Sequence, residues 1–327
     1  QFFNQELKAG APADGENPTG QNWGFPTYNW KNLSAADYSW WKDRLKNANH
    51  YYDAYRLDHI LGFFRIWEIP VEFRSGIEGH FNPALPYTLD EILEKGLHIE
   101  GLFHEDPRHP GMYQPYITPQ SENLPLWQKQ VFGDLYNDFF YHRHDEFWKK
   151  NAMKKLPELL SSTGMLACGE DLGMVPDCVP SVMEHEKILS LKMKGMEQEG
   201  EWKQLSVCAT SSHDMDTLRM QSPEDPESEE CSRILAGFLN SPSMLAIFPI
   251  QDWLAADQSL RRADRNAERI NQPANPNHHW CFRMHIPLEK LTSDEGLPLI
   301  SQIRTMISHS GRLVPALSDS PTSTSLP

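Results

Sequence analysis

Residues 54–70 read AYRLDHILGFFRIWEIP, and this stretch, with the residues on either side of it, indicates the fold class. Its first part, Ala54 to Asp58, is a short mixed apolar run that ends in the polar pair Asp58-His59, which is typical of a strand followed by a loop. Before it, Trp and Leu residues recur at helical spacing and predict a helix from Ala35 to about Asn49. The chain therefore changes from helix to strand just before Asp58.

The same change recurs further along the chain. Residues 126–160 are predicted to be helical because their apolar residues form a stripe with helical spacing. Runs typical of strands lie at 165–168, 188–193, 205–210 and 244–248. Strands that alternate with helices indicate parallel βα units of an α/β protein, as in a (β/α)8 TIM-type barrel. In such barrels the active-site side chains lie on loops after the carboxyl ends of strands.

Three segments depart from this alternation. Residues 9–30 are dense in Gly, Pro, Asn and aromatic residues, so we expect a loop and neither helix nor strand. Residues 72–125 are too long for an ordinary connection and are predicted to be an inserted lid or subdomain, rich in loops, with one short helix at 89–95. The tail, residues 313–327, is rich in Ser, Thr and Pro and is expected to be disordered.

The composition indicates a globular protein whose partners are neither nucleic acids nor membranes. Hydrophobic residues make up 39% of the 327 residues, and the formal net charge of -15 would repel both nucleic acids and anionic membrane surfaces. The five cysteines show no CxxC pair and no zinc-site spacing, which favours reduced thiols in a cytoplasmic protein. His142 and His144 face different directions on a helix, so we expect both to be solvated and predict neither a metal nor a cofactor.

Three carboxylates, Asp58, Glu170 and Asp214, follow predicted strands. A retaining reaction at a glycosidic bond needs one ionised carboxylate as the nucleophile and one protonated carboxyl group, about 5–5.5 Å away, that assists the leaving oxygen. Arg56 would point to the same face of its strand as Asp58 and keep that aspartate ionised. Glu170 follows an apolar strand, where partial burial would hold its proton. Asp214, preceded by His213, would hold sugar hydroxyls, although residue types and spacing alone leave these roles open.

The sequences around the three carboxylates closely resemble motifs of glycoside hydrolase family 77, the amylomaltases or disproportionating enzymes. The opening stretch resembles the nucleophile strand, GEDLG at 169–173 resembles the acid/base motif, and SSHDMDTLR at 211–219 resembles the motif of the stabilising aspartate. The resemblance implies a retaining 4-α-glucanotransferase with Asp58 as nucleophile, Glu170 as general acid/base and Asp214 as stabiliser of the transition state. It implies substrate contacts by Arg56, His59, His213, Asn22, Trp23, Tyr28, Asp14, Asp171, His279 and Trp280, and no metal.

Further motifs are similar to the cytosolic plant-type branch of the family and its bacterial relatives. They are GQNWGFPTYNW at 20–30, SMLAIFPIQDW at 243–253 and NPNHHWCFRMHI at 275–286. This branch implies transfer of a glucosyl unit from maltose or malto-oligosaccharides to glycogen or a soluble heteroglycan, with release of glucose. The family's first barrel strands would precede residue 1, so residues 1–312 are expected to form the C-terminal portion of the barrel, as a fragment of a longer protein.

Some alternatives remain open at the level of sequence. The same carboxylates could serve an α-glucan hydrolase, in which water is the acceptor, or remain in an inactive glucan-binding fragment. The aromatic residues Trp23, Phe25, Tyr28 and Trp30 could stack on sugar rings or anchor their loop. Asp252, after the last predicted strand, could contact substrate, but we expect it to cap the helix that follows.

Overall fold

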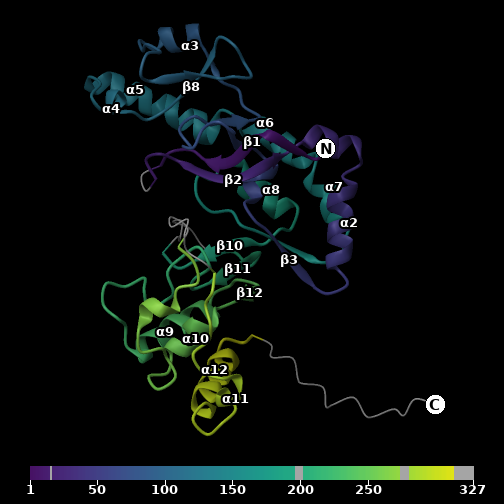
Figure 1. Ribbon diagram of the computed structural model, residues 1–327, viewed down its shortest axis with the longest axis vertical. Helices are drawn as coiled ribbons and strands as arrows, with labels where there is room; N and C mark the ends of the chain where they lie inside the picture. The colour runs from purple at the N-terminus through teal and green to yellow at the C-terminus, as the bar shows by residue number, and fades with distance from the viewer. Residues whose placement is uncertain (15–16, 196–201, 273–279, 313–327) are drawn as a thin grey trace, which may run out of the picture. The chain divides into compact units, whose positions relative to one another are not determined.

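The computed structural model describes residues 1–14, 17–195, 202–272 and 280–312 (Figure 1). The chain divides into two compact units, Gln1–Ser190 and Leu191–Pro327. Both units combine helices with strands, so the predicted α/β class is confirmed. The tail that was expected to be disordered, residues 313–327, lies outside the described residues.

The first unit contains an antiparallel sheet of four strands in the order β2-β1-β4-β5. The strands are β1 (Phe3–Ala11), β2 (Gln21–Tyr28), β4 (Ile66–Pro70) and β5 (His80–Asn82). The prediction of a loop over residues 9–30 was therefore wrong for residues 9–11 and 21–28, which are strands, whereas residues 12–14 and 17–20 contain neither helix nor strand. Strand β1 obtains its hydrogen-bond partners from β2 and from β4, which is distant in sequence. The glycine that suggested a loop permits this pairing, because a Cβ at Gly10 would overlap the carbonyl oxygen of Gln21.

A parallel pair of strands in the first unit confirms two predicted strands. It joins β3 (Ala54–Leu57) to β9 (Leu166–Gly169), with Arg56 opposite Cys168 and Leu57 opposite Gly169. Leu189, just before β10, adds an isolated parallel bridge to Cys168. Because β3 and β9 run in the same direction, the residues that follow them emerge at the same edge.

Helices of the first unit cover the regions where helix was predicted, and α1 and α8 are helices that were not predicted. They are α1 (Trp30–Ala35), α2 (Ser39–Ala48), α5 (Leu126–Asn137), the π-helix η2 (Asp138–His142), α6 (Asp145–Met153), α7 (Leu156–Leu160) and α8 (Cys178–His185). The helix predicted from Ala35 begins only at Ser39, because Asp37 and Tyr38 adopt positive φ angles of 51° and 52° that interrupt it. The helical stretch 126–160 is confirmed, but it is divided into short segments.

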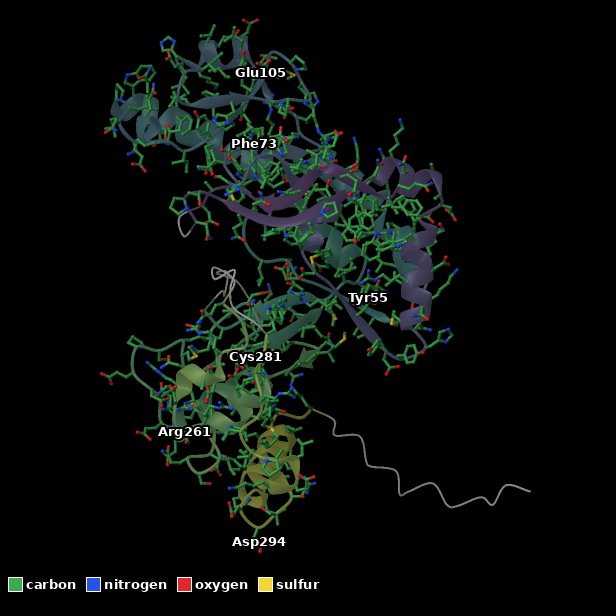
Figure 2. All side chains as sticks on the ribbon, in the orientation of Figure 1. Tyr55, Phe73, Glu105, Arg261, Cys281 and Asp294 are labelled. Carbon is green, nitrogen blue, oxygen red and sulfur yellow. The ribbon has the colours of Figure 1, made fainter. Side chains whose placement is uncertain are left out.

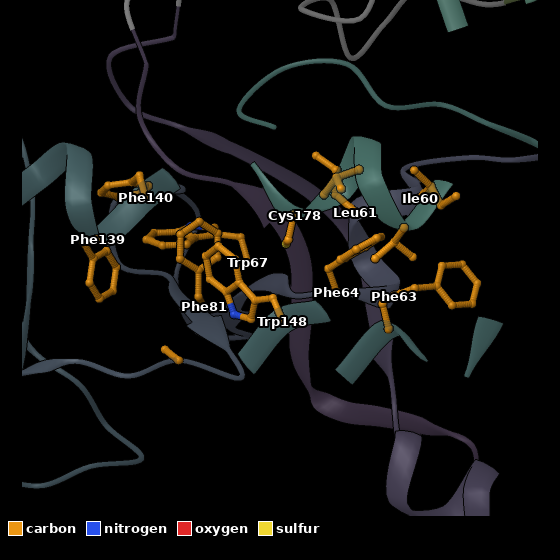
Figure 3. Packing of buried hydrophobic residues seen from close by; sticks show 14 of the residues in the cluster. Ile60, Leu61, Phe63, Phe64, Trp67, Phe81, Phe139, Phe140, Trp148 and Cys178 are labelled. Carbon is orange, nitrogen blue, oxygen red and sulfur yellow. The ribbon is translucent and has the colours of Figure 1, made fainter. Parts of the chain in front are cut away.

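The core of the first unit is built from aromatic and branched side chains of these elements (Figure 3). The short helix η1 (Ile60–Phe63), directly after the loop at Asp58, places Ile60 and Leu61 in this core. His144 is fully buried and stacks on Trp148 with ring centroids 4.2 Å apart, so its predicted solvation was wrong. Since His142 and His144 do point to different sides, one of the two faces the core.

The region 72–125 contains more regular structure than expected. Besides the predicted short helix, α3 (Leu89–Glu94), it has a small antiparallel sheet in the order β6-β8-β7 and the helix α4 (Pro119–Glu122). The strands are β6 (Tyr87–Thr88), β7 (Phe103–Glu105) and β8 (Met112–Pro115). Helix α3 begins where predicted because Thr88 and Glu91 form a reciprocal capping box.

The second unit contains a three-stranded sheet in the order β10-β11-β12. Its strands, β10 (Ser190–Met193), β11 (Ser206–Ala209) and β12 (Leu245–Ala246), confirm the three remaining predicted strands, and β11 and β12 are parallel. The helical elements are α9 (Ser228–Leu239), α10 (Ile250–Ala255), η3 (Arg265–Glu268), α11 (Leu288–Leu291) and α12 (Leu297–His309). Their apolar faces form a second core that includes Cys231, Leu235 and Leu254. None of the helices described in either unit is both long and apolar enough to span a bilayer.

Candidate active site

Asp58 and Glu170 follow the paired strands β3 and β9 and therefore lie at one edge of the parallel pair. Two main-chain hydrogen bonds continue the pairing past the strand ends. Glu170 N donates to Leu57 O at 2.9 Å, and Ile60 N donates to Glu170 O at 3.0 Å. The backbone on either side of Asp58 is thereby fixed to Glu170, and the structure brings together the first two predicted catalytic residues.

The carboxylate of Glu170 is held by two main-chain N–H groups. His59 N donates to Oε2 and Leu172 N donates to Oε1, each at 2.9 Å. Burial raises the pKa of Glu170 above its ordinary value, and the negative charge of Asp58 acts in the same direction. The two N–H donors and the charge of Arg56 lower this pKa but do not cancel the effect of burial. The half-buried position predicted for Glu170 is confirmed.

Asp58 occupies a different environment, because its carboxylate forms an ion pair with the guanidinium of Arg56 and is open to solvent. The Asp58 side chain is 73% exposed and that of Arg56 40%. The predicted same-face placement of the two side chains is thus confirmed. One carboxyl group is accessible and paired with a cation, whereas its neighbour is half-buried and held by N–H donors. Such a difference suits two carboxyl groups for two different roles.

His59 connects this edge to the aromatic residues of β2. The Trp23 ring packs edge-on against the His59 ring with centroids 4.9 Å apart, and it stacks on Phe25 at 5.9 Å. Burial, together with the charge of Arg65, lowers the pKa of His59 to about 3, so the imidazole is neutral. Phe25 is 53% exposed. Trp23 and Phe25 therefore present aromatic surface next to the residue that follows Asp58.

Tyr28 and Trp30 point into the protein instead. The Tyr28 ring lies 5.3 Å from Trp30, 5.9 Å from Trp40 and 5.4 Å from Trp41. Burial raises the pKa of Tyr28 above its ordinary value. Of the two interpretations of the aromatic segment, anchoring thus describes Tyr28 and Trp30, and the substrate contact predicted for Tyr28 has no support from this packing.

The other polar residues predicted in the first unit make local contacts. Asn22 Nδ2 donates to the carbonyl oxygen of Phe73, labelled in Figure 2, at 3.2 Å. Asp14 Oδ1 accepts a hydrogen bond from Asn17 N at 2.6 Å. Asp171 Oδ2 accepts one from the Ser190 hydroxyl at 2.6 Å.

Asp214 lies in the second unit, on the loop after β11. Its Oδ2 lies 2.9 Å from Nε2 of His213, as expected for a supporting residue, and the His213 ring contacts the exposed ring of Trp280 with centroids 5.1 Å apart. Asn271 Nδ2 donates to Asp214 Oδ1 at 3.4 Å. Asn271 was not predicted from the sequence, although it opens the Asn- and Pro-rich stretch before Trp280. His279 lies outside the described residues.

Asp252 does not cap α10, because the cap position is taken by Pro249 and Asp252 lies within the helix. It is buried, and its Oδ2 accepts hydrogen bonds from the hydroxyl groups of Thr210 and Ser211, each at 2.6 Å. Its Oδ1 accepts one from Leu218 N at 2.9 Å. The capping prediction was wrong because the carboxylate turns toward the neighbouring strand end and away from its own helix terminus.

One group among the described residues has the spacing of metal ligands: His142, Asp145 and Asp177, whose ligand atoms lie within 4.8 Å of one another. These side chains already have protein partners. His142 Nδ1 lies 3.0 Å from Asp177 Oδ2, and Asp145 Oδ1 accepts from Cys178 N at 3.2 Å. We assign no metal to this group.

The chain is similar to known 4-alpha-glucanotransferases over most of its length. Residues 1–289 match the family model described as 4-alpha-glucanotransferase, glycoside hydrolase family 77. The 4-alpha-glucanotransferase DPE2 of Oryza sativa subsp. japonica is 32% identical, over 97% of this chain and 45% of its own length. The 4-alpha-glucanotransferase of Chlamydia caviae is 28% identical, over 90% of this chain and 49% of its own length. The chain thus spans about half the length of the curated relatives it matches.

A solved structure, the amylomaltase from Streptococcus agalactiae in complex with acarbose, matches 95% of this chain and 53% of its own length. The TM-score is 0.59 and the sequence identity 17%, which shows a shared fold. The likeness to plant-type enzymes that the motifs predicted agrees with the match to the rice protein. From the match over residues 1–289 we conclude that this chain belongs to glycoside hydrolase family 77, the 4-alpha-glucanotransferases.

Proposed function

We propose that this chain carries the catalytic groups of a retaining 4-α-glucanotransferase. Asp58 is the nucleophile, Glu170 the general acid/base and Asp214 the stabiliser of the transition state. The observation that carries the proposal is the pairing of Asp58 and Glu170 across the ends of β3 and β9: Asp58 is exposed and paired with Arg56, whereas Glu170 is half-buried with a raised pKa. The role of Asp214 rests on its motif and on its contact with His213.

The reaction proceeds in two displacements. An oxygen of Asp58 attacks C1 of the donor glucosyl unit while Glu170 gives its proton to the departing glycosidic oxygen, so that a glucosyl ester forms on Asp58. Glu170, now a carboxylate, then takes the proton of an acceptor hydroxyl as that oxygen attacks C1 and releases Asp58. Glu170 regains in the second step the proton that it gives in the first, and no cofactor is required.

Malto-oligosaccharides are the donor class that fits the exposed aromatic residues. Trp23 and Phe25, beside His59, offer faces on which the apolar side of a glucose ring can stack. We propose maltose as the donor and glycogen or a soluble heteroglycan as the acceptor, with release of glucose, as the likeness to plant-type sequences implies. The Streptococcus agalactiae amylomaltase, solved in complex with acarbose, supports an oligosaccharide ligand.

Two further features belong to the proposal. Residues 72–125, which contain the small sheet β6-β8-β7, form a subdomain inserted between the nucleophile and the acid/base. A cytoplasmic location fits the five cysteines, all free and all within the described residues.

The test is transfer of label in the full chain. The protein is incubated with maltose and radiolabelled glycogen, and both free glucose and label movement are measured. We expect label to move between the polymer and small sugars while glucose is released. Release of glucose without label movement would replace the transferase with a hydrolase, and binding of maltose or glycogen without turnover would indicate an inactive glucan-binding protein.

Two variants accompany this test. Asp58→Asn should abolish turnover and leave maltose binding, because the nucleophile is lost while the amide keeps the shape of the side chain. Asp43→Asn, at an exposed position on α2, is the matched control and should behave as the parent protein. Equal turnover by Asp58→Asn and the parent protein would contradict the assigned nucleophile.

A further inference from the structure

The loop that follows β11 carries Asp214 and is held at both ends by one carboxylate from the next βα unit. Thr210 and Ser211 leave the strand just before Asp214, and Leu218 ends the loop after it. All three bind Asp252, the hydroxyl groups at 2.6 Å and the main-chain N–H of Leu218 at 2.9 Å. The single side chain of Asp252 thereby joins the two ends of the loop formed by residues 210–218.

The contrast in burial within this loop is large. Asp252 is 1% exposed, Thr210 and Ser211 are 0% and 3% exposed, and Leu218 is 1% exposed. The side chain of Asp214, by contrast, is 51% exposed. A hydrogen bond among buried groups is costly to lose because the remaining partner has no water to bind, whereas a bond at the surface is readily exchanged with solvent. The ends of the loop are therefore far more strongly fixed than its tip.

The 2.9 Å contact of the Asp214 carboxylate with His213 lies within the loop, and its hydrogen bond from Asn271, outside the loop, is long. The hydrogen bond from Asn271 Nδ2 measures 3.4 Å, and the backbone N of Asp214 binds the Ser212 hydroxyl at 3.2 Å. His213 is its sequence neighbour and moves with the same loop. The position of the Asp214 carboxylate thus depends mainly on how the loop leaves the sheet and returns.

A second set of contacts holds the loop through residues that follow it in the sequence. Gln221 Nε2 donates to the carbonyl oxygens of Thr210 and Asp216, each at 2.9 Å. Glu268 accepts a hydrogen bond from the hydroxyl of Thr217 at 3.1 Å and forms a buried ion pair with Arg219. Gln221 thus also links the start of the loop to Asp216, and Glu268 holds Thr217, whereas Asp252 joins Thr210 and Ser211 directly to Leu218.

We propose that Asp252 is a positioning residue for the transition-state stabiliser Asp214: it joins Thr210 and Ser211 to Leu218 and so sets the place of the carboxylate between them. The inference rests on the proposed function. Because Asp252 is buried, we assign it a positioning role and no direct contact with substrate. It holds the loop so that the Asp214 carboxylate can contact the transition state without a rearrangement of the loop. A displacement of a catalytic group by about 1 Å can lower a rate by about 10²-fold.

The experiment compares kcat, KM for maltose and thermal unfolding of the full chain with those of three variants. Asp252→Ala removes all three hydrogen bonds, and Ser211→Ala removes one of them. Ser243→Ala is the control. It breaks the buried 2.8 Å bond to Ser206 at the other end of β11, away from the proposed catalytic residues. Rates are measured well below each variant's unfolding temperature, so that only folded protein contributes.

We expect Asp252→Ala to lower kcat by about 10²-fold with KM within about threefold of the parent value, because an interaction with the transition state alone is lost. Ser211→Ala should lower kcat by a smaller factor in the same manner. Ser243→Ala should lower the unfolding temperature and leave kcat unchanged. If Asp252→Ala does not fold, Ser211→Ala decides the question by the same criterion.

A double variant separates positioning from general stability. If Asp252 acts through Asp214, adding Asp252→Ala to Asp214→Asn should lower the residual kcat by less than about threefold, although the losses in thermal stability still add. A further full loss of kcat in the double variant overturns the inference, as does an unchanged kcat in both Asp252→Ala and Ser211→Ala. Failure of the proposed function gives a different result from failure of this inference: the parent protein shows no turnover, or Asp214→Asn leaves turnover unchanged.

Discussion

The main-chain N–H of His59 donates a 2.9 Å hydrogen bond to the carboxylate of Glu170. The residue that follows the proposed nucleophile thus holds the proposed acid/base. His59 adopts a positive φ of 44°, which turns the chain after Asp58, and the next main-chain N–H, that of Ile60, donates to the carbonyl oxygen of Glu170. The Glu170 carboxyl group is therefore held by backbone atoms, which side-chain substitutions leave in place, whereas the Asp58 carboxylate pairs with the side chain of Arg56.

Glu170→Gln should remove the general acid and keep one of the two main-chain hydrogen bonds, because the amide oxygen can accept from only one of the N–H groups of His59 and Leu172. Because burial raises the pKa of Glu170, its proton is lost above the ordinary range for glutamate, and kcat/KM of the parent protein should fall as the pH rises through that raised pKa. In Glu170→Gln, kcat with maltose should drop by about 10²–10⁴-fold and this alkaline decline should disappear.

A donor with a better leaving group checks the same assignment. Fluoride leaves without a proton, so Glu170→Gln should form the glucosyl ester from α-glucosyl fluoride at close to the parent rate. The exposed Glu146→Gln on α6 is the control and should match the parent protein with both donors. An equal loss with fluoride and maltose would argue against Glu170 as the acid.

Arg56→Met should lower kcat by about 10- to 100-fold, because the hydrogen bond between the guanidinium and the Asp58 carboxylate joins two charged groups. Arg56→Lys keeps the charge and should recover part of the loss. Steady-state kinetics with maltose measure both, and Arg304→Met, at an exposed position on α12, serves as control. A parent-like rate for Arg56→Met would show that the ion pair does not support the nucleophile.

Trp23→Ala should weaken glucan binding, whereas Tyr28→Ala should chiefly weaken folding. Trp23 packs at the edge of the site against His59, so its loss should raise KM for maltose by about three- to tenfold. Tyr28 packs among Trp30, Trp40 and Trp41, and its truncation should lower the free energy of unfolding by about 3–5 kcal/mol. Isothermal titration with maltose measures the loss of binding, and urea unfolding measures the loss of stability. The assignment would be reversed if Tyr28→Ala weakened binding and Trp23→Ala weakened folding.

Lys155 should make the stability of the first unit depend on pH. Its Nζ donates to the carbonyl oxygen of Phe63 at 2.7 Å and lies 4.6 Å from the Trp30 ring centroid. Burial lowers its pKa from 10.5 to about 7. Between these values the unfolded chain keeps a proton that the folded chain has lost. This group therefore makes the free energy of unfolding rise with pH through that window, by at most about 1.4 kcal/mol per pH unit.

Lys155→Met should remove this rise, so its stability relative to the parent protein should be most favourable below about pH 7. Urea unfolding between pH 6 and pH 9 measures the effect. Lys154→Met, the exposed neighbour, is the control and should give a curve parallel to that of the parent. Parallel curves for Lys155→Met and the parent would show that the buried amine keeps an ordinary pKa.

Local sequence was sufficient for the elements whose pattern is internal to them. The strand before Asp58, the apolar strand before Glu170 and the helix with the Thr88 capping box all formed where predicted. Their signals arise from neighbouring residues, so no distant partner is needed to define them. The motifs around Asp58, Glu170 and Asp214 likewise pointed to the family that the match over residues 1–289 shows.

What only the tertiary structure decided depends on partners distant in sequence. Within the Gly- and Pro-rich residues 9–30, residues 9–11 and 21–28 form strands, because β1 pairs with β2 and with β4, which is about 60 residues away. His144 is buried because its helix faces a core that the local sequence does not define. Asp252 binds Thr210, Ser211 and Leu218 across two parallel strands instead of capping its own helix. The sequence by itself thus indicated which residues we propose as the catalytic groups. The packing of distant segments determined what holds those residues in place, because a hydrogen-bond partner is specified by position in space and not by spacing along the chain.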